Sequence, residues 1–373
     1  MPAKRPLALT AFLAVLLALV LSACGGGGSS TGASEESPAE KTVTKTEGPN
    51  GEKPVQVSSL SLSPEEEEKL KEGDYKVALV WAANAPFTEA VQSGVEEELG
   101  NLGVEITSSS HAEFNTSKEA SDLKAALAKS PDVVISAPVD PSTAATMYDE
   151  VRKAGAELVF LSTVPEGYEP GKQYVGIVTD DLYTMGAMAA EALAESVGEE
   201  GEIGMINYNI PYYVTNQRDA AFASTIRKKY PKMEIVAESG FTDPTKVQEV
   251  AQGMIAQHPN LAGIYASWAE PAEQVLAALR AAKNSTTKVV TLDLNDTVVT
   301  DMIKEGQVAA IVVDKAFEIG TGLARVAAYS LVGKTAPAFS VVGSITVTPE
   351  NVEEAYEESL HKSAPSTVLE ALG

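Results

Sequence analysis

Segments typical of β-strands and α-helices alternate along this chain from Lys76 onward. The first apolar run, Lys76–Trp81, is too short for a helix and leads through a small-residue turn with Pro86 into a helix-like apolar repeat that begins at Val91. A buried strand that feeds a helix is typical of parallel sheets, in which ligands lie beyond the carboxyl ends of the strands. We therefore expect the turn from Trp81 to Phe87 to border a binding site for a small molecule.

The alternation falls into two series of about equal length. The first series of expected strands comprises Lys76–Trp81, Val104–Ser108, Val133–Ser136, Glu157–Leu161 and Tyr174–Val178. The second comprises Ile203–Ile206, Glu234–Glu238, Gly263–Ala266, Val289–Leu292 and Ala309–Val313. Helical patterns separate the strands in both series, as in right-handed βαβ units. The sequence therefore predicts an α/β protein with two doubly wound, Rossmann-like lobes.

The first 24 residues form a separate segment. Lys4 and Arg5 precede the apolar run Leu7–Leu21, which is shorter than the roughly 20 residues of a membrane-spanning helix. The run closes on Leu-Ser-Ala-Cys24, which resembles the lipobox of a bacterial lipoprotein. The resemblance implies that residues 1–23 are a signal peptide and that Cys24 carries the lipid that anchors the chain to the cell membrane. A plain secretory signal that ends at Ala23 is the alternative.

Residues 24–73 have the composition of a linker. Gly, Ser, Thr, Pro and Glu dominate, and no apolar periodicity appears before Leu60. Such a segment buries too little apolar surface to offset the entropy of ordering, so we expect a flexible tether. Near its end, Ser63 followed by Pro64 and two glutamates matches a helix N-cap with an acidic first turn, which predicts a short helix before Lys76.

Charge and motif content argue against several classes of function. The formal net charge is −24, which disfavours nucleic acid as a partner. The three histidines have no metal-ligand spacing, and neither a phosphate-binding P-loop nor a G-x-G-x-x-G turn follows an expected strand. We therefore expect no metal, no cofactor and no enzymatic activity.

The order of several short motifs along the chain is more specific than any one of them. From about Lys76 to Leu360 the chain resembles the ribose-type, sugar-binding members of the type I periplasmic binding proteins, the extracytoplasmic receptors of ABC importers. The matching stretches are Asn84–Phe87, Ser136–Asp140, Thr179–Asp181, Asn216–Phe222, His258–Ile264 and Val289–Asp293.

This resemblance implies two lobes that are joined by three crossovers. We place the crossovers near Val178–Asp180, Asp314–Lys315 and Val341–Gly343. The N-terminal lobe then comprises residues 74–179 and 315–341, and the C-terminal lobe residues 180–314 and 342–373. A ligand that contacts both lobes shifts the hinge equilibrium toward the closed form.

Aromatic residues at strand ends are the first candidate ligand contacts. The resemblance implies that Phe87 stacks on the apolar face of a sugar ring, although packing in the core is the alternative. Trp81 and Trp268, the two tryptophans of the chain, end strands in opposite halves. We interpret them as a pair that sandwiches the ligand, with packing between the lobes as the alternative.

Charged residues supply the polar contacts that the resemblance implies. Arg218 matches the arginine that donates to sugar oxygens, and an ordinary helix-surface arginine is the alternative. Asp293 matches a carboxylate that accepts two hydroxyl protons, although it could instead cap the helix that begins near Asp296. Asp314 stands where ribose-type proteins usually carry glutamine, so it favours hydroxyl donors or an amine on the ligand.

Other positions differ from the family pattern or extend it. Ser162 and Thr163 replace an Asp-Arg pair, and Trp268 replaces an asparagine, which suggests a less usual ligand such as a deoxysugar or polyol. Asp140, after the third strand, is a further expected contact. The loop from Asn207 to Tyr213 is rich in Tyr and Asn, and we expect it to close over the ligand with Tyr213 or Asn209 in contact with it. An ordinary surface loop explains the cluster nearly as well.

Three functions remain at this stage. The first is capture of a monosaccharide or polyol by a monomeric lipoprotein that delivers it to an ABC transporter permease. The second is a sensor of the same fold that signals to a membrane kinase or chemoreceptor. The third, a sugar-responsive repressor, would need a helix-turn-helix before the first strand, and the lipobox and acidic linker occupy that place.

Overall fold

The structure, a computed structural model, describes residues 45–210 and 212–373. The predicted signal peptide, the lipidation site at Cys24 and the linker up to residue 44 lie outside the described residues. All described residues belong to one compact unit. Among them, no helix combines the length and the apolar character that a membrane crossing requires.

Two sheets form the framework of the described chain. The first has the order β1-β12-β6-β5-β4-β2-β3 with parallel pairing throughout, and the second has the order β13-β11-β10-β9-β7-β8, in which β13 alone is antiparallel to its neighbour. The strands of the first sheet are β1 (Val55–Gln56), β2 (Lys76–Trp81), β3 (Glu105–His111), β4 (Val133–Ser136), β5 (Glu157–Leu161), β6 (Gly176–Asp180) and β12 (Phe339–Val342). Those of the second are β7 (Gly201–Tyr208), β8 (Met233–Phe241), β9 (Gly263–Ala266), β10 (Lys288–Leu292), β11 (Val308–Asp314) and β13 (Ser344–Val347). The predicted α/β fold with two doubly wound lobes is confirmed.

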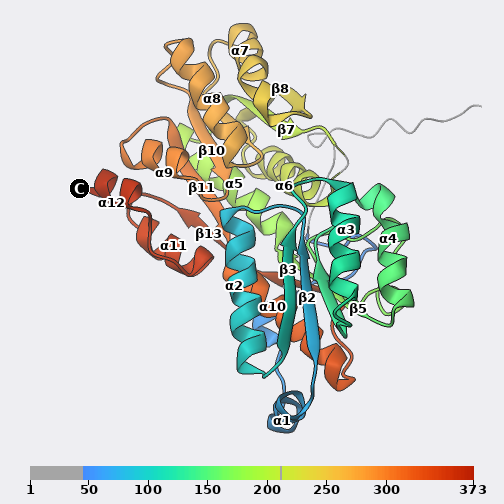
Figure 1. The fold of residues 1–373 in the computed structure, drawn as a ribbon. Coiled ribbons are helices and arrows are strands. Elements are labelled where there is room, and N and C mark those ends of the chain that lie inside the picture. Colours follow the sequence, from blue (N-terminus) through green and yellow to red (C-terminus); the bar gives the residue numbers. More distant parts are fainter. Residues whose placement is uncertain (1–44, 211) are drawn as a thin grey trace, which may run out of the picture. The chain divides into compact units, whose positions relative to one another are not determined.

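Helices cover both faces of each sheet (Figure 1). The first sheet lies between α2 (Pro86–Asn101) with α10 (Ala316–Val332) and α3 (Thr116–Leu127) with α4 (Pro141–Lys153). The second lies between α5 (Leu182–Val197) with α6 (Tyr213–Lys229) and the group α7 (Val247–Gln257), α8 (Ala269–Ala281), α9 (Asp296–Ile303), α11 (Val352–Leu360) and α12 (Ser366–Leu372). The short helices α1 (Pro64–Glu72), η1 (Val57–Ser59) and η2 (Pro244–Lys246) complete the described elements.

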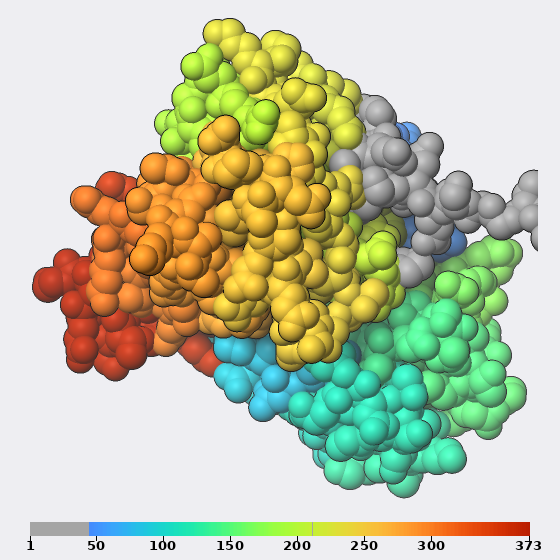
Figure 2. Space-filling model, turned by 90° about the horizontal axis from the view of Figure 1, so that it is seen from above, coloured from blue at the N-terminus to red at the C-terminus, as the bar shows by residue number. Residues whose placement is uncertain are grey.

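The alternation of side chains along each strand explains the two-sided cores. In β10, Val289 packs in the cluster with α7 and α8, whereas Val290 packs in the cluster with α5 and α6. At the C-terminus, the red residues of α12 lie beside the orange residues of α9 (Figure 2), where Thr367 Oγ1 donates to the carboxylate of Asp296 at 2.9 Å.

The chain passes between the two sheets three times. It leaves the first sheet after β6 to form α5, returns after β11 to form α10, and leaves again between β12 and β13. Asp180 is the last residue of β6 and Asp314 is the last residue of β11. Two carboxylates therefore stand directly at the first two crossovers.

The segment before β2 is ordered, which corrects part of the expected linker. Within residues 45–73, β1 pairs with β12 at the edge of the first sheet, and Val57 and Leu60 are buried. The short helix predicted from Ser63 is present as α1, where the Ser63 hydroxyl accepts from the Glu66 N–H at 3.3 Å and the Glu66 carboxylate accepts from the Ser63 N–H at 2.8 Å. Composition alone could not show this order, because it comes from pairing with residues far away in the sequence.

Candidate functional site

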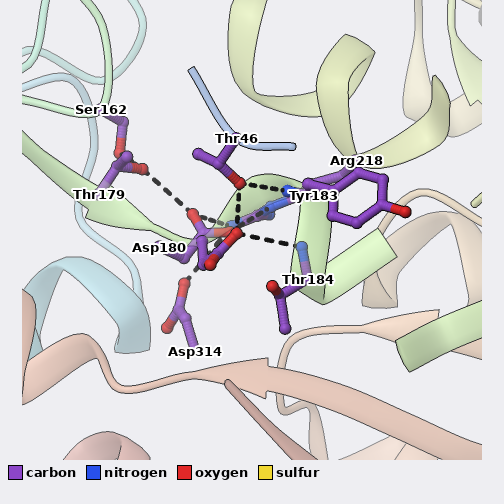
Figure 3. Close-up of polar contacts among 9 residues, drawn as sticks. Thr46, Ser162, Thr179, Asp180, Tyr183, Thr184, Arg218 and Asp314 are labelled. Carbon is purple, nitrogen blue, oxygen red and sulfur yellow. Dashed lines mark hydrogen bonds and ion pairs between the residues drawn. The ribbon is translucent and has the colours of Figure 1, made fainter. Parts of the chain in front are cut away.

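Arg218 lies at the centre of a buried polar cluster at the crossovers (Figure 3). It projects from the second turn of α6, and its guanidinium donates through Nε to Asp180 Oδ2 at 3.0 Å and through Nη2 to Asp180 Oδ1 at 2.7 Å. The same Nη2 lies 3.5 Å from Asp314 Oδ2. Arg218, Asp180 and Asp314 are only 7%, 1% and 3% exposed. This geometry excludes the alternative of an ordinary helix-surface arginine.

Asp293 belongs to the same electrostatic group. It follows β10, is half-buried, and has a left-handed backbone (φ 67°) held by its N–H, which donates to the Val312 carbonyl at 3.0 Å. Ser162, at the end of β5 in the other lobe, has a similar φ of 62°. Left-handed backbone at non-glycine residues is uncommon and is concentrated at functional sites. The side chain that caps α9 is that of Asn295, so the alternative of Asp293 as the helix cap is wrong.

Three carboxylates share one guanidinium in this cluster. Burial favours the uncharged acid and raises the pKa of Asp293 to about 6, although Arg218 opposes the shift and Asp180 and Glu270 add to it. Burial, followed by repulsion from Asp293 and Asp180, also raises the pKa of Asp314 well above its ordinary value. Burial disfavours the charged form of Arg218, but the surrounding carboxylates outweigh burial and raise its pKa. The cluster therefore has an excess of acceptors over donors.

A second buried carboxylate fixes α6 against the sheet. Asp219 accepts hydrogen bonds from Tyr265 Oη at 2.8 Å and from Ser267 Oγ at 2.9 and 3.0 Å, and burial raises its pKa to about 7. Tyr265 in turn stacks on Phe222 of α6 with ring centroids 4.2 Å apart. Asp219 thus sets the position of the helix that carries Arg218, a role that our sequence analysis did not assign.

Trp268 stands at the same edge of the second sheet as Asp293. Strands β9 and β10 are neighbours with Ala266 opposite Thr291, so the residues two positions further on are level with each other. The half-buried Trp268 ring meets Tyr208 edge-on at 5.3 Å and Phe241 at 5.1 Å. An aromatic surface therefore lies in the C-terminal lobe at the edge of the second sheet that Asp293 follows.

Trp81 does not form the expected pair with Trp268. Its side chain is 0% exposed and packs in the core beside α2, where its Nε1 donates to Gln92 Oε1 at 2.9 Å. The alternation along β2 places it on the same face as Val77 and Leu79. The buried indole leaves no face for a solute, so the predicted sandwich is not formed in this structure.

The other candidates of the N-terminal lobe follow strands of the first sheet and differ in how accessible their side chains are to a ligand. Phe87, in the first turn of α2, is half-buried and packs against the core while keeping an exposed part. Ser162 Oγ accepts from Thr179 Oγ1 at 3.0 Å, and the neighbouring Thr163 is buried. Asp140 caps α4 and accepts from the Ser142 N–H and from two hydroxyls, so both of its carboxylate oxygens are already occupied.

The N-terminal strap, which we define as residues 46–56, reaches from the N-terminal lobe to the crossover. Thr46 is 3% exposed; its hydroxyl donates to the Asp181 carboxylate and accepts from the Tyr183 N–H at 2.8 Å (Figure 3). The Glu47 carbonyl accepts from Gln217 Nε2 at 3.0 Å. Further along, Tyr174 donates to Glu52 at 3.1 Å. The strap therefore contacts both lobes next to Arg218.

A comparison with known families decides what kind of protein this is. A family described as "Periplasmic binding protein domain" matches residues 75–335, which is more than half of the chain. The chain belongs to this family. For this periplasmic binding protein, family membership implies an extracytoplasmic location.

Curated relatives of the binding protein carry names that refer to ribose import. The ribose import binding protein of Bacillus subtilis (strain 168) is 24% identical over 202 residues, which is 54% of this chain and 63% of that protein. The match thus spans less than two thirds of that relative. The ribose import binding protein of Salmonella typhimurium is 21% identical over 279 residues, or 74% of this chain and 92% of that protein.

Solved structures share the fold of this periplasmic binding protein. An ABC transporter solute-binding protein from Agrobacterium vitis, bound with α-D-tagatopyranose, has a TM-score of 0.69 and 23% identity and covers 78% of this chain and 100% of its own. A periplasmic ribose ABC transporter protein from Conexibacter woesei has a TM-score of 0.68 and 21% identity over 77% of this chain and 98% of its own. These likenesses identify the type I periplasmic binding fold with two lobes.

For several residues of the site in this binding protein, the sequence did not indicate the contacts that they make. Asp180 lay inside the motif Thr179–Asp181, yet its pairing with Arg218 spans 38 residues and could not be read from spacing. Thr46 lay in a segment whose composition indicated a linker. In the described ranges, no group of three or more His, Cys, Asp or Glu side chains has the arrangement of a metal site.

Proposed function

We propose that this periplasmic binding protein captures a small polar solute, a monosaccharide or polyol, between its lobes and delivers it to an ABC importer. The family match supports a solute-binding role, and the names of the curated relatives support a sugar. Catalysis is not part of the proposal, because family members bind solutes and the Arg218 cluster offers hydrogen-bonding groups but no paired nucleophile and base.

The observation that carries the proposal is the position of the Arg218 cluster. Its members come from α6, from the ends of β6 and β11 and from the residue after β10, so they converge where the chain crosses between the sheets. A solute that bonds to Asp293 and Arg218 while it touches Phe87 gains contacts with both lobes only when the lobes approach. Its binding free energy then favours closure.

The proposed contacts divide into polar groups and aromatic surfaces. Arg218 donates to solute oxygens, and Asp293 and Asp314 accept from solute hydroxyls. Phe87 and Trp268 cover apolar C–H faces from opposite lobes. Ser162 and Thr163, which follow β5, and Tyr213, the first residue of α6, are proposed as secondary contacts. Trp81 and Asp140 are left out, because one is enclosed in the core and the other caps a helix.

The N-terminal region fits delivery at a membrane. We propose that the signal peptide is removed before Cys24, that a lipid on Cys24 anchors the monomeric protein to the outer face of the cell membrane, and that residues 25–44 act as the tether. Residues 46–73 are then part of the folded domain. The proposed partners are the solute and the transporter permease, which senses the closed form.

A thermal-shift and calorimetric screen of the mature protein tests the function. Pentoses, hexoses, their deoxy forms and polyols are compared with amino acids and nucleosides, because a ligand that binds only the folded state raises the melting temperature. We expect a sugar or polyol to bind with 1:1 stoichiometry and Arg218→Ala to abolish binding, whereas Arg280→Ala, a remote arginine on α8, leaves binding unchanged. Binding of amino acids or nucleosides alone would overturn the sugar assignment.

A further inference from the structure

The charge balance of the proposed binding site points to a class of solute. Among the described residues, the ion pairs of Asp180 and Asp314 involve one cation, Arg218. Lys315, the next residue after Asp314, is occupied in an ion pair with Glu358 at 2.7 Å. Asp293 makes no described hydrogen bond through its side chain and is also close enough to Glu270 to be influenced by it. One guanidinium therefore faces a surplus of carboxylates.

The bonding within the cluster shows which carboxylates are free for a ligand. Asp180 takes both strong guanidinium bonds, at 2.7 and 3.0 Å, whereas Asp314 has only the 3.5 Å contact although it is 97% buried, as its 3% exposure shows. A buried carboxylate normally has several close donors, because burial without them is costly. Asp314 thus lacks the close donors that its burial requires, and the half-buried Asp293 has no described hydrogen bond through its carboxylate.

A second, independent feature lies at the same edge of the second sheet, on β7, which β9 separates from β10. Asn207, at the end of β7, is 3% exposed, and its Oδ1 accepts no described hydrogen bond. It follows Ile206, which packs on the α7 and α8 face, so the alternation of the strand turns Asn207 toward the face covered by α6, the helix of Arg218. A further acceptor without a donor therefore stands at the same edge of the sheet.

The aromatic rings complete the surroundings of a cation. Trp268 follows β9 as Asp293 follows the neighbouring strand β10, and its half-buried indole packs against Tyr208. Ring faces attract ammonium groups, most strongly at Trp, and the attraction increases where water is excluded. Carboxylates without donors next to an indole are the combination expected to bind an organic ammonium.

We propose that the solute is an amine-bearing sugar or polyol whose ammonium group is bound by Asp293 and Asp314 at the side of Trp268. The proposal rests on the proposed sugar-binding function. The ammonium supplies the donors that these two carboxylates lack, and Arg218 remains paired with Asp180 and donates to a ring or hydroxyl oxygen. Burial and the neighbouring carboxylates raise the pKa of Asp293 and of Asp314 although Arg218 opposes the rise, which agrees with a site that holds more carboxylates than cations.

Calorimetry with matched sugars tests the solute class. The mature protein is titrated with D-glucosamine, D-galactosamine and D-mannosamine, with the parent hexoses, and with the N-acetyl forms, which keep the nitrogen but lose the charge. We expect the best amine to bind about 10- to 100-fold more tightly than its parent hexose and its N-acetyl form, since hydrogen bonds between charged groups exceed neutral ones by this margin.

Two variants link the preference to the named carboxylates. Asp314→Asn and Asp293→Asn should each weaken binding of the amine about tenfold more than binding of its parent hexose, whose hydroxyls also contact these two side chains. Asp132→Asn is the matched control, because Asp132 accepts from the Lys76 N–H at the opposite, amino-terminal edge of the first sheet. Unchanged melting of the variants shows that they fold.

The outcomes separate the two proposals. If a parent hexose binds as tightly as its amine, the solute-class inference fails while the sugar-binding function stands. If the amine is preferred and neither variant reduces the preference, the assignment to Asp293 and Asp314 is overturned. If no hexose or amino hexose binds and the screen of pentoses, deoxy sugars and polyols is also negative, both the function and the inference are wrong.

Discussion

The backbone carbonyl of Arg218 lies where a side chain on Gly186 would have to be placed. A Cβ added to Gly186 would stand 2.1 Å from that oxygen, so α5 and α6 touch backbone to backbone at this point. Because Asp180 directly precedes Asp181, the N-cap of α5, the contact fixes the separation of the two partners in the main ion pair of the site. The absence of one side chain thus controls where the guanidinium lies.

Gly186→Ala should therefore displace α6 and weaken both folding and ligand binding. We expect a loss of about 1–3 kcal/mol in the free energy of unfolding, since the methyl group meets backbone and not a flexible side chain. Solute affinity should fall at least tenfold. Gly253→Ala in α7 is the control: open space surrounds that position, so alanine should be neutral or stabilising by about 0.5–1 kcal/mol. Chemical denaturation measures the stability of both variants, and calorimetry measures their solute affinity. Equal effects of the two substitutions would contradict the role assigned to Gly186.

Asp219 should give folding stability a distinct pH dependence. Burial raises its pKa to about 7 in the folded protein, above the ordinary aspartate value of 3.8 that applies in the unfolded chain, so the folded state binds more protons between these values. The stabilisation is complete below about pH 4 and is lost as pH rises through about 7. Asp219→Asn removes this titration, so its free energy of unfolding should fall less between pH 5 and pH 8. Urea titrations across this range measure the slope; an identical slope in both proteins would exclude Asp219 as its source.

Removal of the Thr46 hydroxyl should loosen the start of α5. Thr46→Val loses the bond to Asp181 and leaves the Tyr183 N–H without its acceptor, which should lower the free energy of unfolding by about 1–3 kcal/mol. Hydrogen exchange should speed up at the Tyr183 amide. Ser59→Ala, in η1 directly after the strap, removes an exposed hydroxyl bond and should change stability by less than about 0.5 kcal/mol. Unchanged exchange at Tyr183 in the valine variant would show that the strap does not hold the crossover.

The two tryptophans should respond in opposite ways to truncation. Trp81→Ala leaves a cavity in the core and should lower the free energy of unfolding by about 3–5 kcal/mol. Trp81→Phe should retain solute affinity, because the indole has no exposed face. Trp268→Ala should instead lower solute affinity about tenfold or more with a smaller loss of stability. Calorimetry and thermal unfolding of the three variants test this division, which fails if Trp81→Phe abolishes binding.

Local patterns in the sequence determined the strands that are buried on both faces and the residues that follow them. Lys76–Trp81, Val133–Ser136 and Gly263–Ala266 have the bounds that apolar runs predicted, because a fully buried parallel strand must be apolar along its length. The helix cap at Ser63 was equally readable, because its hydrogen bonds join residues three positions apart.

The candidate site could be predicted as a set of residues but not as a geometry. Arg218, Asp293 and Asp314 were expected at strand ends and helix starts, and the structure places them in one electrostatic group. The pairing of Arg218 with Asp180 and Asp314 joins positions 38 and 96 residues apart. No periodicity encodes such a distance, since it depends on how two sheets are connected.

By itself, then, the sequence determined that the chain forms two α/β lobes with polar residues at the carboxyl ends of the strands, because burial and turn chemistry act over a few residues. Only the tertiary structure decided three things. These are the side of the first sheet on which Trp81 packs, the packing of residues 46–56 across a crossover, and the carboxylate that accepts both strong hydrogen bonds from Arg218. Those outcomes depend on contacts between segments that are distant in the sequence, and such contacts contribute to stability only once the sheets have assembled.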